Sequence, residues 1–351
     1  MKVLEEDLLY VAEKIQNLDF GDSTFFITGA TGLVGSVLVK TLLKYNNVYG
    51  HHCKVIAMVR SIEKAEKIFG KESDIEGLMY CVGDVTNVIS CAEHIDYIVH
   101  AASETKSLNM VQKPVETLWT SVCGTKNVLD FAIEKNVKGI IYLSSMEAFG
   151  KVNSQDERVK EDQLGYIALE NVRNCYPESK RLCENMCVCY AGEYNLPVTT
   201  ARLAQTFGAG VPETDQRVFS QFARSVINGQ DIVLHTKGNS YGNYVYTADA
   251  AAAVFLLLKK GARGEVYTVA NETTTMRIRE MAHLVAGEIA EGKIDVVFDI
   301  PEGNQYGYAS ETALKLDASK LRELGWSPKY DLKDFYNRLI LSWNEANQLL
   351  S

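Results

Sequence analysis

The sequence contains no apolar run approaching the roughly 20 residues that a membrane-spanning helix needs. It has no excess of positive charge either, since 36 lysines and arginines against 45 aspartates and glutamates give a net charge of -9 and a pI near 5.3. We therefore expect no membrane crossing and no general binding to nucleic acids or membrane surfaces. A local basic pocket for a phosphorylated ligand is still compatible with this balance.

Disulfide-type cysteine spacing is also absent. The eight cysteines are scattered, and the N-terminal residues lack the charged-then-apolar layout of a signal peptide. We expect a protein of the reducing cytoplasm. Cys183 and Cys187 share a helix face, but Cys189 points elsewhere and no histidine follows at zinc-finger spacing. These residues are expected to be buried thiols, and no metal site is predicted.

The pattern of apolar residues predicts an α/β fold. Apolar residues at helical spacing over 3–18 indicate an amphipathic helix laid against the body of the protein. Short apolar runs then alternate with helical stretches such as 35–44 and 115–135, which predicts a Rossmann-type doubly wound parallel sheet covered on both faces. The expected strands are 24–27, 54–59, 78–82, 97–100, 139–144 and 197–202.

Three glycines follow the first expected strand and open a helical pattern. A strand, a glycine-rich turn and a helix N-terminus in that order predict a site for a dinucleotide pyrophosphate. Gly29 permits the tight turn, Gly32 lets the phosphates approach bare backbone, and Gly35 lets the helix pack closely on the strand. The expected cofactor-binding loop also includes Thr31, Leu33 and Val34.

The regular alternation ends near Gln205, where glycine-, asparagine- and tyrosine-rich stretches appear at 205–212, 238–246 and 303–308. We expect residues 1–20 to form the N-terminal helix. Residues 21–203, together with about 240–262, are expected to form an NAD(P)-binding Rossmann domain. Residues 204–239 and 263–351 are expected to form a smaller, discontinuous C-terminal substrate lobe.

Two further segments carry candidate catalytic groups. Pro177 suits the first turn of a helix, so Tyr176 and Lys180 should share one face at its entry. The adjacent ammonium is then expected to bring the pKa of Tyr176, about 10 when free, closer to working pH. Ser145 and Glu147 follow an expected strand and should project into the ligand crevice, as a hydrogen-bond donor and a base. The alternatives are an ordinary surface Tyr and Lys, a strand-end Ser, and a solvated Glu.

These features together resemble the extended short-chain dehydrogenase/reductase family. They are the glycine loop, Gly83-Asp84-Val85, His100-Ala101-Ala102, Ser145 and the Tyr176/Lys180 pair, and the match continues through 324–328. Within the family, the chain is similar to NAD(P)-dependent nucleotide-sugar epimerases and dehydratases. The stretches 175–181 with Glu184, and 217–220 with Phe222, resemble the UDP-glucuronate decarboxylase and 4,6-dehydratase branch.

The resemblance implies a catalytic cycle through a 4-keto sugar. Tyr176 takes the proton of the sugar C4 hydroxyl as hydride leaves C4, Lys180 holds the nicotinamide ribose and lowers the pKa of Tyr176, and Ser145 bonds the same sugar oxygen. The ketone acidifies the C5 proton, which Glu147 would remove before water leaves C6. The same ketone also permits decarboxylation of a uronic acid or inversion at C4. A net NADPH-dependent keto-sugar reductase and a non-catalytic NADP-binding scaffold are the alternatives.

Four positions depart from the family pattern and predict an atypical substrate pocket. Met146 replaces an aspartate and cannot donate a proton, which disfavours a plain dTDP-glucose dehydratase. Ser121 and Gln205 replace asparagines, the latter beside the nicotinamide and substrate, and Gly242 replaces an arginine. Arg217 therefore becomes the leading candidate for binding the nucleotide diphosphate, with a surface cation as its alternative.

The end of the second strand bears on the cofactor. Arg60 stands where an acidic residue would repel a 2′-phosphate, so NADP is expected, with NAD and an Arg60 stacked on adenine as the alternative. The resemblance places Asp84 and Val85 near the adenine, although a turn role for Asp84 is the alternative, and it places Ala101 and Ala102 beside the cofactor. The expected partners are a nucleotide-diphosphate sugar and a second copy of the chain, which would form a homodimer through the helices at 115–135 and 177–192.

Overall fold

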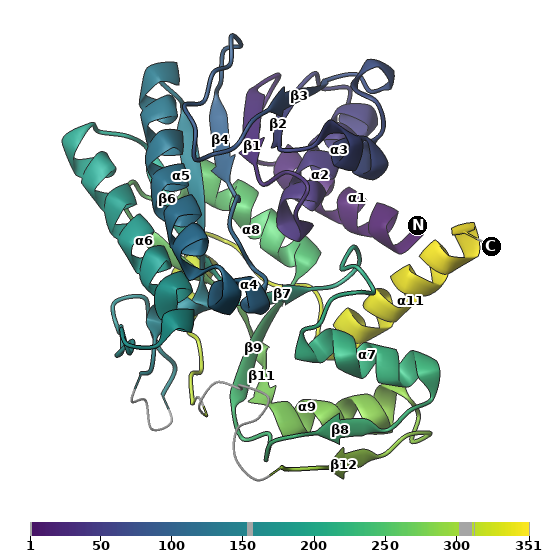
Figure 1. Cartoon of the computed structure of the whole chain (residues 1–351). Helices are drawn as coiled ribbons and strands as arrows, with labels where there is room; N and C mark the ends of the chain where they lie inside the picture. The colour runs from purple at the N-terminus through teal and green to yellow at the C-terminus, as the bar shows by residue number, and fades with distance from the viewer. Residues whose placement is uncertain (1, 153–156, 302–310, 312, 351) are drawn as a thin grey trace.

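The computed structural model describes residues 2–152, 157–301, 311 and 313–350. Its centre is a seven-stranded sheet in the order β10-β6-β5-β4-β1-β2-β3, in which all neighbouring strands are parallel. The expected doubly wound Rossmann-type sheet is thus confirmed (Figure 1). Its strands are β1 (Thr24–Thr28), β2 (Lys54–Val59), β3 (Leu78–Val82), β4 (Tyr97–His100), β5 (Gly139–Ser145), β6 (Val198–Leu203) and β10 (Val266–Val269).

Helices cover both faces of this sheet, which is why its central strands are continuous apolar runs. On one face, α2 (Leu33–Tyr49) and α8 (Thr247–Lys260) bury a core that includes Phe25 and Ile27 of β1. On the other face, α5 (Pro114–Lys135) and α6 (Cys175–Glu193) pack against each other and close a second core. Cys183 and Cys187 are buried in that second core, as expected, whereas Cys189 is exposed.

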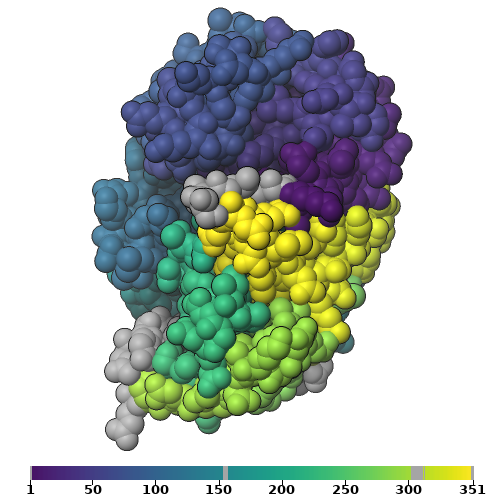
Figure 2. Space-filling view, turned by 90° about the vertical axis from the view of Figure 1, so that its right-hand side faces the viewer, coloured from purple at the N-terminus to yellow at the C-terminus, as the bar shows by residue number. Residues whose placement is uncertain are grey.

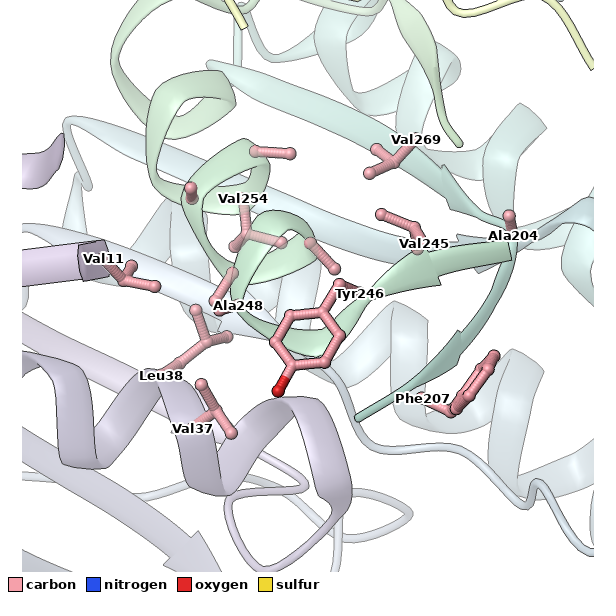
Figure 3. Close-up of a cluster of buried hydrophobic side chains, with 14 of the residues drawn as sticks. Val11, Val37, Leu38, Ala204, Phe207, Val245, Tyr246, Ala248, Val254 and Val269 are labelled. Carbon is pink, nitrogen blue, oxygen red and sulfur yellow. The ribbon is translucent and has the colours of Figure 1, made fainter. Parts of the chain in front are cut away.

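The chain ends meet beside the first of these cores. The expected N-terminal helix is confirmed as α1 (Lys2–Gln16), which lies on α2 and α8 and also contacts the last helix, α11 (Leu332–Leu350). Figure 3 shows Val11 of α1, Leu38 of α2 and Val254 of α8 converging in the core. Arg338 of α11 bonds Asp7 of α1 at 2.6 Å, and Figure 2 shows the two terminal segments side by side on one face.

Smaller elements form a second group below the sheet in Figure 1. A three-stranded sheet contains β7 (Gln205–Phe207), β9 (Tyr241–Tyr246) and β11 (Asn271–Arg277), and a two-stranded sheet contains β8 (Ile232–Leu234) and β12 (Val296–Phe298). The helices here are α7 (Val218–Asn228) and α9 (Ile278–Leu284), whereas the short helix α10 (Ser319–Glu323) contacts β10 of the central sheet. The remaining short helices, α3 (Ile62–Phe69) and α4 (Ser107–Gln112), flank the central sheet.

Two expected domain boundaries differ from the sheets in the structure. The sequence places residues from 263 onward in the smaller lobe, but β10, at 266–269, pairs in parallel with β6 in the central sheet. Conversely, β9 lies within the stretch about 240–262 and belongs to the three-stranded sheet. The expected segment at 303–308 lies outside the described residues. In the part of the chain that is described, no helix is both long enough and apolar enough to span a bilayer.

Candidate active site

The carboxyl ends of the parallel strands bring the predicted site residues to one edge of the sheet. The strand order reverses between β1 and β4, and a crevice outside this switch point is where doubly wound sheets bind ligands. The segments that leave the strands at this edge are the glycine loop after β1, Arg60 after β2, Gly83–Val85 after β3, Ala101 after β4, and Ser145 at the end of β5. Sequence positions more than 100 residues apart are therefore neighbours in space.

The glycine loop has the shape that a dinucleotide requires. Gly29 has a φ of +65°, and a Cβ built on it would lie 2.6 Å from backbone atoms of Ala101 and Ala102. A Cβ on Gly35 would collide with the Gly29 carbonyl group, and a Cβ on the exposed Gly32 would lie 3.2 Å from the same carbonyl oxygen. The first turn of α2 contains no acidic residue, and its first N–H groups have no partner within the helix. An NAD(P) pyrophosphate fits this cradle.

A pocket of about 270 Å³ lies at the ends of β2 and β3. Asp84 lines this pocket, and its carboxylate accepts hydrogen bonds from the N–H and hydroxyl of Thr86, at 2.9 and 2.8 Å. These bonds and the nearby Arg60 guanidinium hold the pKa of Asp84 below its usual value despite partial burial. Arg60 is exposed. The Asn127 side-chain amide donates a hydrogen bond to the Val85 carbonyl oxygen at 2.8 Å. Asp84 therefore lines the pocket and also makes the hydrogen bonds of a turn residue, which was its alternative role.

Below Ala101 and Ala102 lies a buried histidine. The Nδ1 atom of His100 is 2.8 Å from the Thr28 hydroxyl, and its Nε2 atom is 3.2 Å from the Thr125 hydroxyl. Burial, helped by the Lys180 charge, lowers the pKa of His100 to about 3. A neutral His100 therefore braces the cofactor crevice and is not a candidate for acid–base catalysis.

Tyr176, Ser145 and Lys180 come together at the end of β5. Tyr176 and Lys180 are both buried on the sheet-facing side of α6, and the Lys180 Nζ atom lies 5.7 Å from the Tyr176 ring centroid. Lys180 donates to the Leu143 carbonyl oxygen at 2.8 Å, which fixes its ammonium beside β5. The Ser145 oxygen accepts the Glu147 N–H at 3.2 Å, so its hydroxyl proton is available for the Tyr176 oxygen. The three residues that the sequence analysis groups therefore lie together in the structure.

The pKa of Tyr176 moves in the opposite direction to the expectation. Burial, followed by the negative charge of Glu147, raises it, and the Ser145 hydrogen bond and the charges of Arg173 and Arg217 only partly offset this rise. Burial also lowers the pKa of Lys180 to about 8. Helical spacing placed the two groups on one face, but it gave no information about how far both would be removed from water.

Glu147 is not a free carboxylate. Both carboxylate oxygens accept hydrogen bonds from the Arg173 guanidinium, and the bond from Nη2 to Oε1 is 2.9 Å long. Both side chains are about one third exposed. Sequence reasoning did not identify Arg173. The available signal was its position three residues before Tyr176, but nothing in the sequence relates it to Glu147, 26 residues earlier.

The two predicted substrate residues occupy different settings. Gln205 begins β7 directly beyond the edge of the central sheet, where it is half-buried. Arg217 is bonded to Asp215 at 2.8 Å and lies over the Phe219 ring, yet its charge still reaches Tyr176. Gly242 leaves no space for an arginine, because the ring of Tyr244 folds over it where a side chain would begin.

A second ion pair missed by sequence reasoning lies beneath the site. Glu184 on α6 and Arg202 on β6 are both buried, and Arg202 donates to Glu184 from Nε at 2.9 and 3.1 Å and from its terminal nitrogen at 2.6 Å. The Ser144 hydroxyl also donates to Glu184. The pair therefore ties the strand end that carries Ser145 to the helix that carries Tyr176 and Lys180.

Comparison with known proteins gives a consistent assignment. Residues 25–270 match the model of the NAD dependent epimerase/dehydratase family. UDP-glucuronic acid decarboxylase 1 of Danio rerio is 27% identical over 90% of this chain and 71% of its own length. The dTDP-D-glucose 4,6-dehydratase of Bos taurus is 24% identical over 97% of each chain.

Solved structures share the fold over nearly the whole chain. An epimerase from Methanothermobacter thermautotrophicus has a TM-score of 0.78 at 22% identity and covers 97% of both chains. A dTDP-glucose 4,6-dehydratase from Bacillus anthracis in complex with NAD has a TM-score of 0.73 at 18% identity, over 93% of this chain and 98% of its own. RMD from Pseudomonas aeruginosa, complexed with NADPH, has a TM-score of 0.71 at 20% identity, over 92% and 99%.

Proposed function

The chain belongs to the NAD-dependent epimerase/dehydratase family, and on that premise we propose that it converts a nucleotide-diphosphate sugar through a 4-keto intermediate, with Tyr176, Lys180 and Ser145 as its catalytic residues. The observation that carries the proposal is the meeting of these three side chains beside the glycine cradle at the sheet's switch point. Relatives named as decarboxylases and dehydratases support the nucleotide-sugar substrate.

Tyr176 acts as the proton acceptor for the sugar C4 hydroxyl. The Ser145 hydroxyl, oriented by the Glu147 N–H, donates to the phenolate and then to the sugar oxygen as the proton moves. When bound, NAD(P)+ would supply the acceptor for the C4 hydride. Lys180, held by Leu143, is placed to hold the nicotinamide ribose while its ammonium faces the Tyr176 ring.

The outcome after C4 oxidation depends on the neighbouring groups. Glu147 is the carboxylate whose charge acts on Tyr176, but both of its oxygens are engaged by the Arg173 guanidinium, so it is not free to take the C5 proton. Met146 supplies no proton to a leaving C6 hydroxyl. Both features favour inversion at C4 or decarboxylation of a uronic acid over elimination of water.

The direct test is turnover of a panel of UDP- and dTDP-linked hexoses and uronic acids, followed by mass spectrometry and nicotinamide absorbance. We expect conversion of at least one member with no net change in reduced cofactor, because the cycle regenerates it. Stoichiometric loss of NADPH absorbance would indicate a net reductase instead. Cofactor binding without turnover of any member would indicate a non-catalytic scaffold and contradict the proposal.

We propose a preference for NADP, with Arg60 as the residue that binds the 2′-phosphate. Arg60 directly follows β2, and its charge acts on Asp84, which lines the pocket. Arg60→Ala should weaken NADP binding by roughly tenfold while NAD binding changes little, since a charged hydrogen bond contributes about 1.5–3 kcal/mol and this side chain is exposed. Fluorescence titration with both cofactors measures this. Lys64→Ala, exposed on α3, is the control, and equal losses for both cofactors would contradict the preference.

We also propose a homodimer that works in the cytoplasm. The paired helices α5 and α6 expose apolar side chains, among them Val115 at 79% and Trp119 at 59% on α5 and Leu182 at 49% on α6. All eight cysteines are free, which suits a reducing compartment. Sedimentation that gave only monomer at micromolar concentration would reject the dimer.

A further inference from the structure

The ion pair between Arg173 and Glu147 joins the two elements that carry the catalytic residues. Glu147 lies in a short helix (Met146–Phe149) that directly follows Ser145, and Arg173 lies in another (Val172–Asn174) that directly precedes α6. Both forks of the guanidinium engage the carboxylate. Such a bidentate pair fixes the orientation of the two side chains as well as their separation, because two parallel hydrogen bonds hold the guanidinium and carboxylate planes together.

We propose that Arg173 is a positioning residue that holds the Glu147 carboxylate in place and offsets the negative charge which it would otherwise direct at Tyr176. The inference rests on the proposed function, since it concerns the proton affinity of the residue that takes the substrate proton. It assigns Arg173 a role through other residues, and the substrate need not touch it.

The backbone on both sides of the pair is fixed before any ligand binds. The Arg173 N–H donates to the Asn171 side chain at 3.1 Å, and the Asn174 amide donates to the Ala168 carbonyl oxygen at 2.9 Å. On the other side, the Glu147 N–H donates to the Ser145 hydroxyl. Because both backbone segments are anchored, the ion pair holds the Ser145 loop and the start of α6 at a fixed separation.

The charges that act on Tyr176 have opposite signs and come from different elements. The charged and titratable groups that face it are Glu147, Arg173, Arg217, Lys180 and Tyr142. Glu147 raises the pKa of Tyr176, whereas Arg173 and Arg217 lower it. Arg217 is already paired with Asp215, so Arg173 is the cation that compensates Glu147 directly.

The test compares single charge deletions by the pH dependence of kcat/KM for nucleotide-sugar conversion. In Arg173→Gln, the unpaired Glu147 charge disfavours the phenolate, so the acid limb should move to higher pH by roughly 0.5–1 pH unit. In Glu147→Gln, the unpaired Arg173 charge favours the phenolate, so the limb should move to lower pH by a similar amount. The double variant, with neither charge, should lie close to wild type.

Two further variants separate charge from structure. Arg173→Lys keeps the charge but loses the fork, so its acid limb should stay near wild type while its rate falls. Arg277→Gln breaks a partly exposed ion pair between the end of β11 and Glu280 of α9, and it should leave the profile unchanged. If Arg173→Gln fails to fold, the double variant carries the test, and a displaced limb there overturns the proposal.

Shifts of the same sign in both single variants, or an Arg173→Gln limb that coincides with wild type, would overturn the role of Arg173 while the proposed function stands. A wild-type protein that oxidises no nucleotide sugar would instead reject the function itself. The two failures are therefore distinguished by the wild-type measurement alone.

Discussion

Tyr176→Phe should lower kcat for nucleotide-sugar conversion by roughly 10²–10⁴-fold, the usual contribution of a positioned acid–base group. The substitution removes one oxygen from a buried side chain and leaves its ring beside Lys180. Packing and cofactor binding should therefore be retained, and only the acceptor for the C4 proton is lost. Turnover is measured by mass spectrometry of the sugar nucleotide, and cofactor affinity by fluorescence titration.

The matched control for this variant is Tyr166→Phe. Tyr166 is 66% exposed, so removal of its hydroxyl should change neither turnover nor stability. Undiminished conversion by Tyr176→Phe would remove the central assignment. Loss of cofactor binding together with activity would show instead that the phenol has a structural role, because a purely chemical role predicts a fall in kcat alone.

Arg202→Met should lower the free energy of unfolding by about 3–5 kcal/mol, the range for breaking a buried ion pair by removing one partner. The loss leaves the Glu184 carboxylate buried with the Ser144 hydroxyl and no cation. Arg202 also donates to the Glu161 carbonyl oxygen at 2.7 Å and lies over the Phe149 ring. The change is measured by urea denaturation followed by circular dichroism.

The double variant Glu184→Met/Arg202→Met tests whether the unpaired charge causes this loss. We expect it to be more stable than Arg202→Met, since replacing a whole buried pair with apolar groups costs less than breaking it. Lys126→Met, which breaks the exposed pair with Asp130, should change stability little. An Arg202→Met variant as stable as wild type would contradict the structural role of the pair.

The sheet was predictable because each central strand is a short, fully buried apolar run bounded by turns. Strand β5, for example, differs from its expected end by one residue, Ser145. The sequence places β10 in the wrong lobe, because no local feature of its four residues indicates the sheet to which they belong. Only its long-range pairing with β6 decides that.

The candidate site shows the same division. Spacing on one helix correctly grouped Tyr176 with Lys180, and strand ends placed Ser145 nearby. The direction of the pKa of Tyr176 and the pairing of Glu147 with Arg173 depend on burial and on contacts between separate loops. Such contacts are set by the packed fold, and periodicity in a single sequence does not contain them.

The way the chain leaves and re-enters the central sheet limits how its two parts can move. Strand β6 continues into β7 through Ala204 alone, and the adjacent β10 continues into β11 through Ala270 alone. Both alanines are buried, and the Ala204 N–H donates to the Val269 carbonyl oxygen at 3.0 Å. Any swing of the three-stranded sheet toward the cofactor crevice must therefore bend both one-residue joints at once, about an axis through them. Gln205, the first residue beyond that axis, would travel least, so it should keep its place at the sheet edge while the far end of the three-stranded sheet turns.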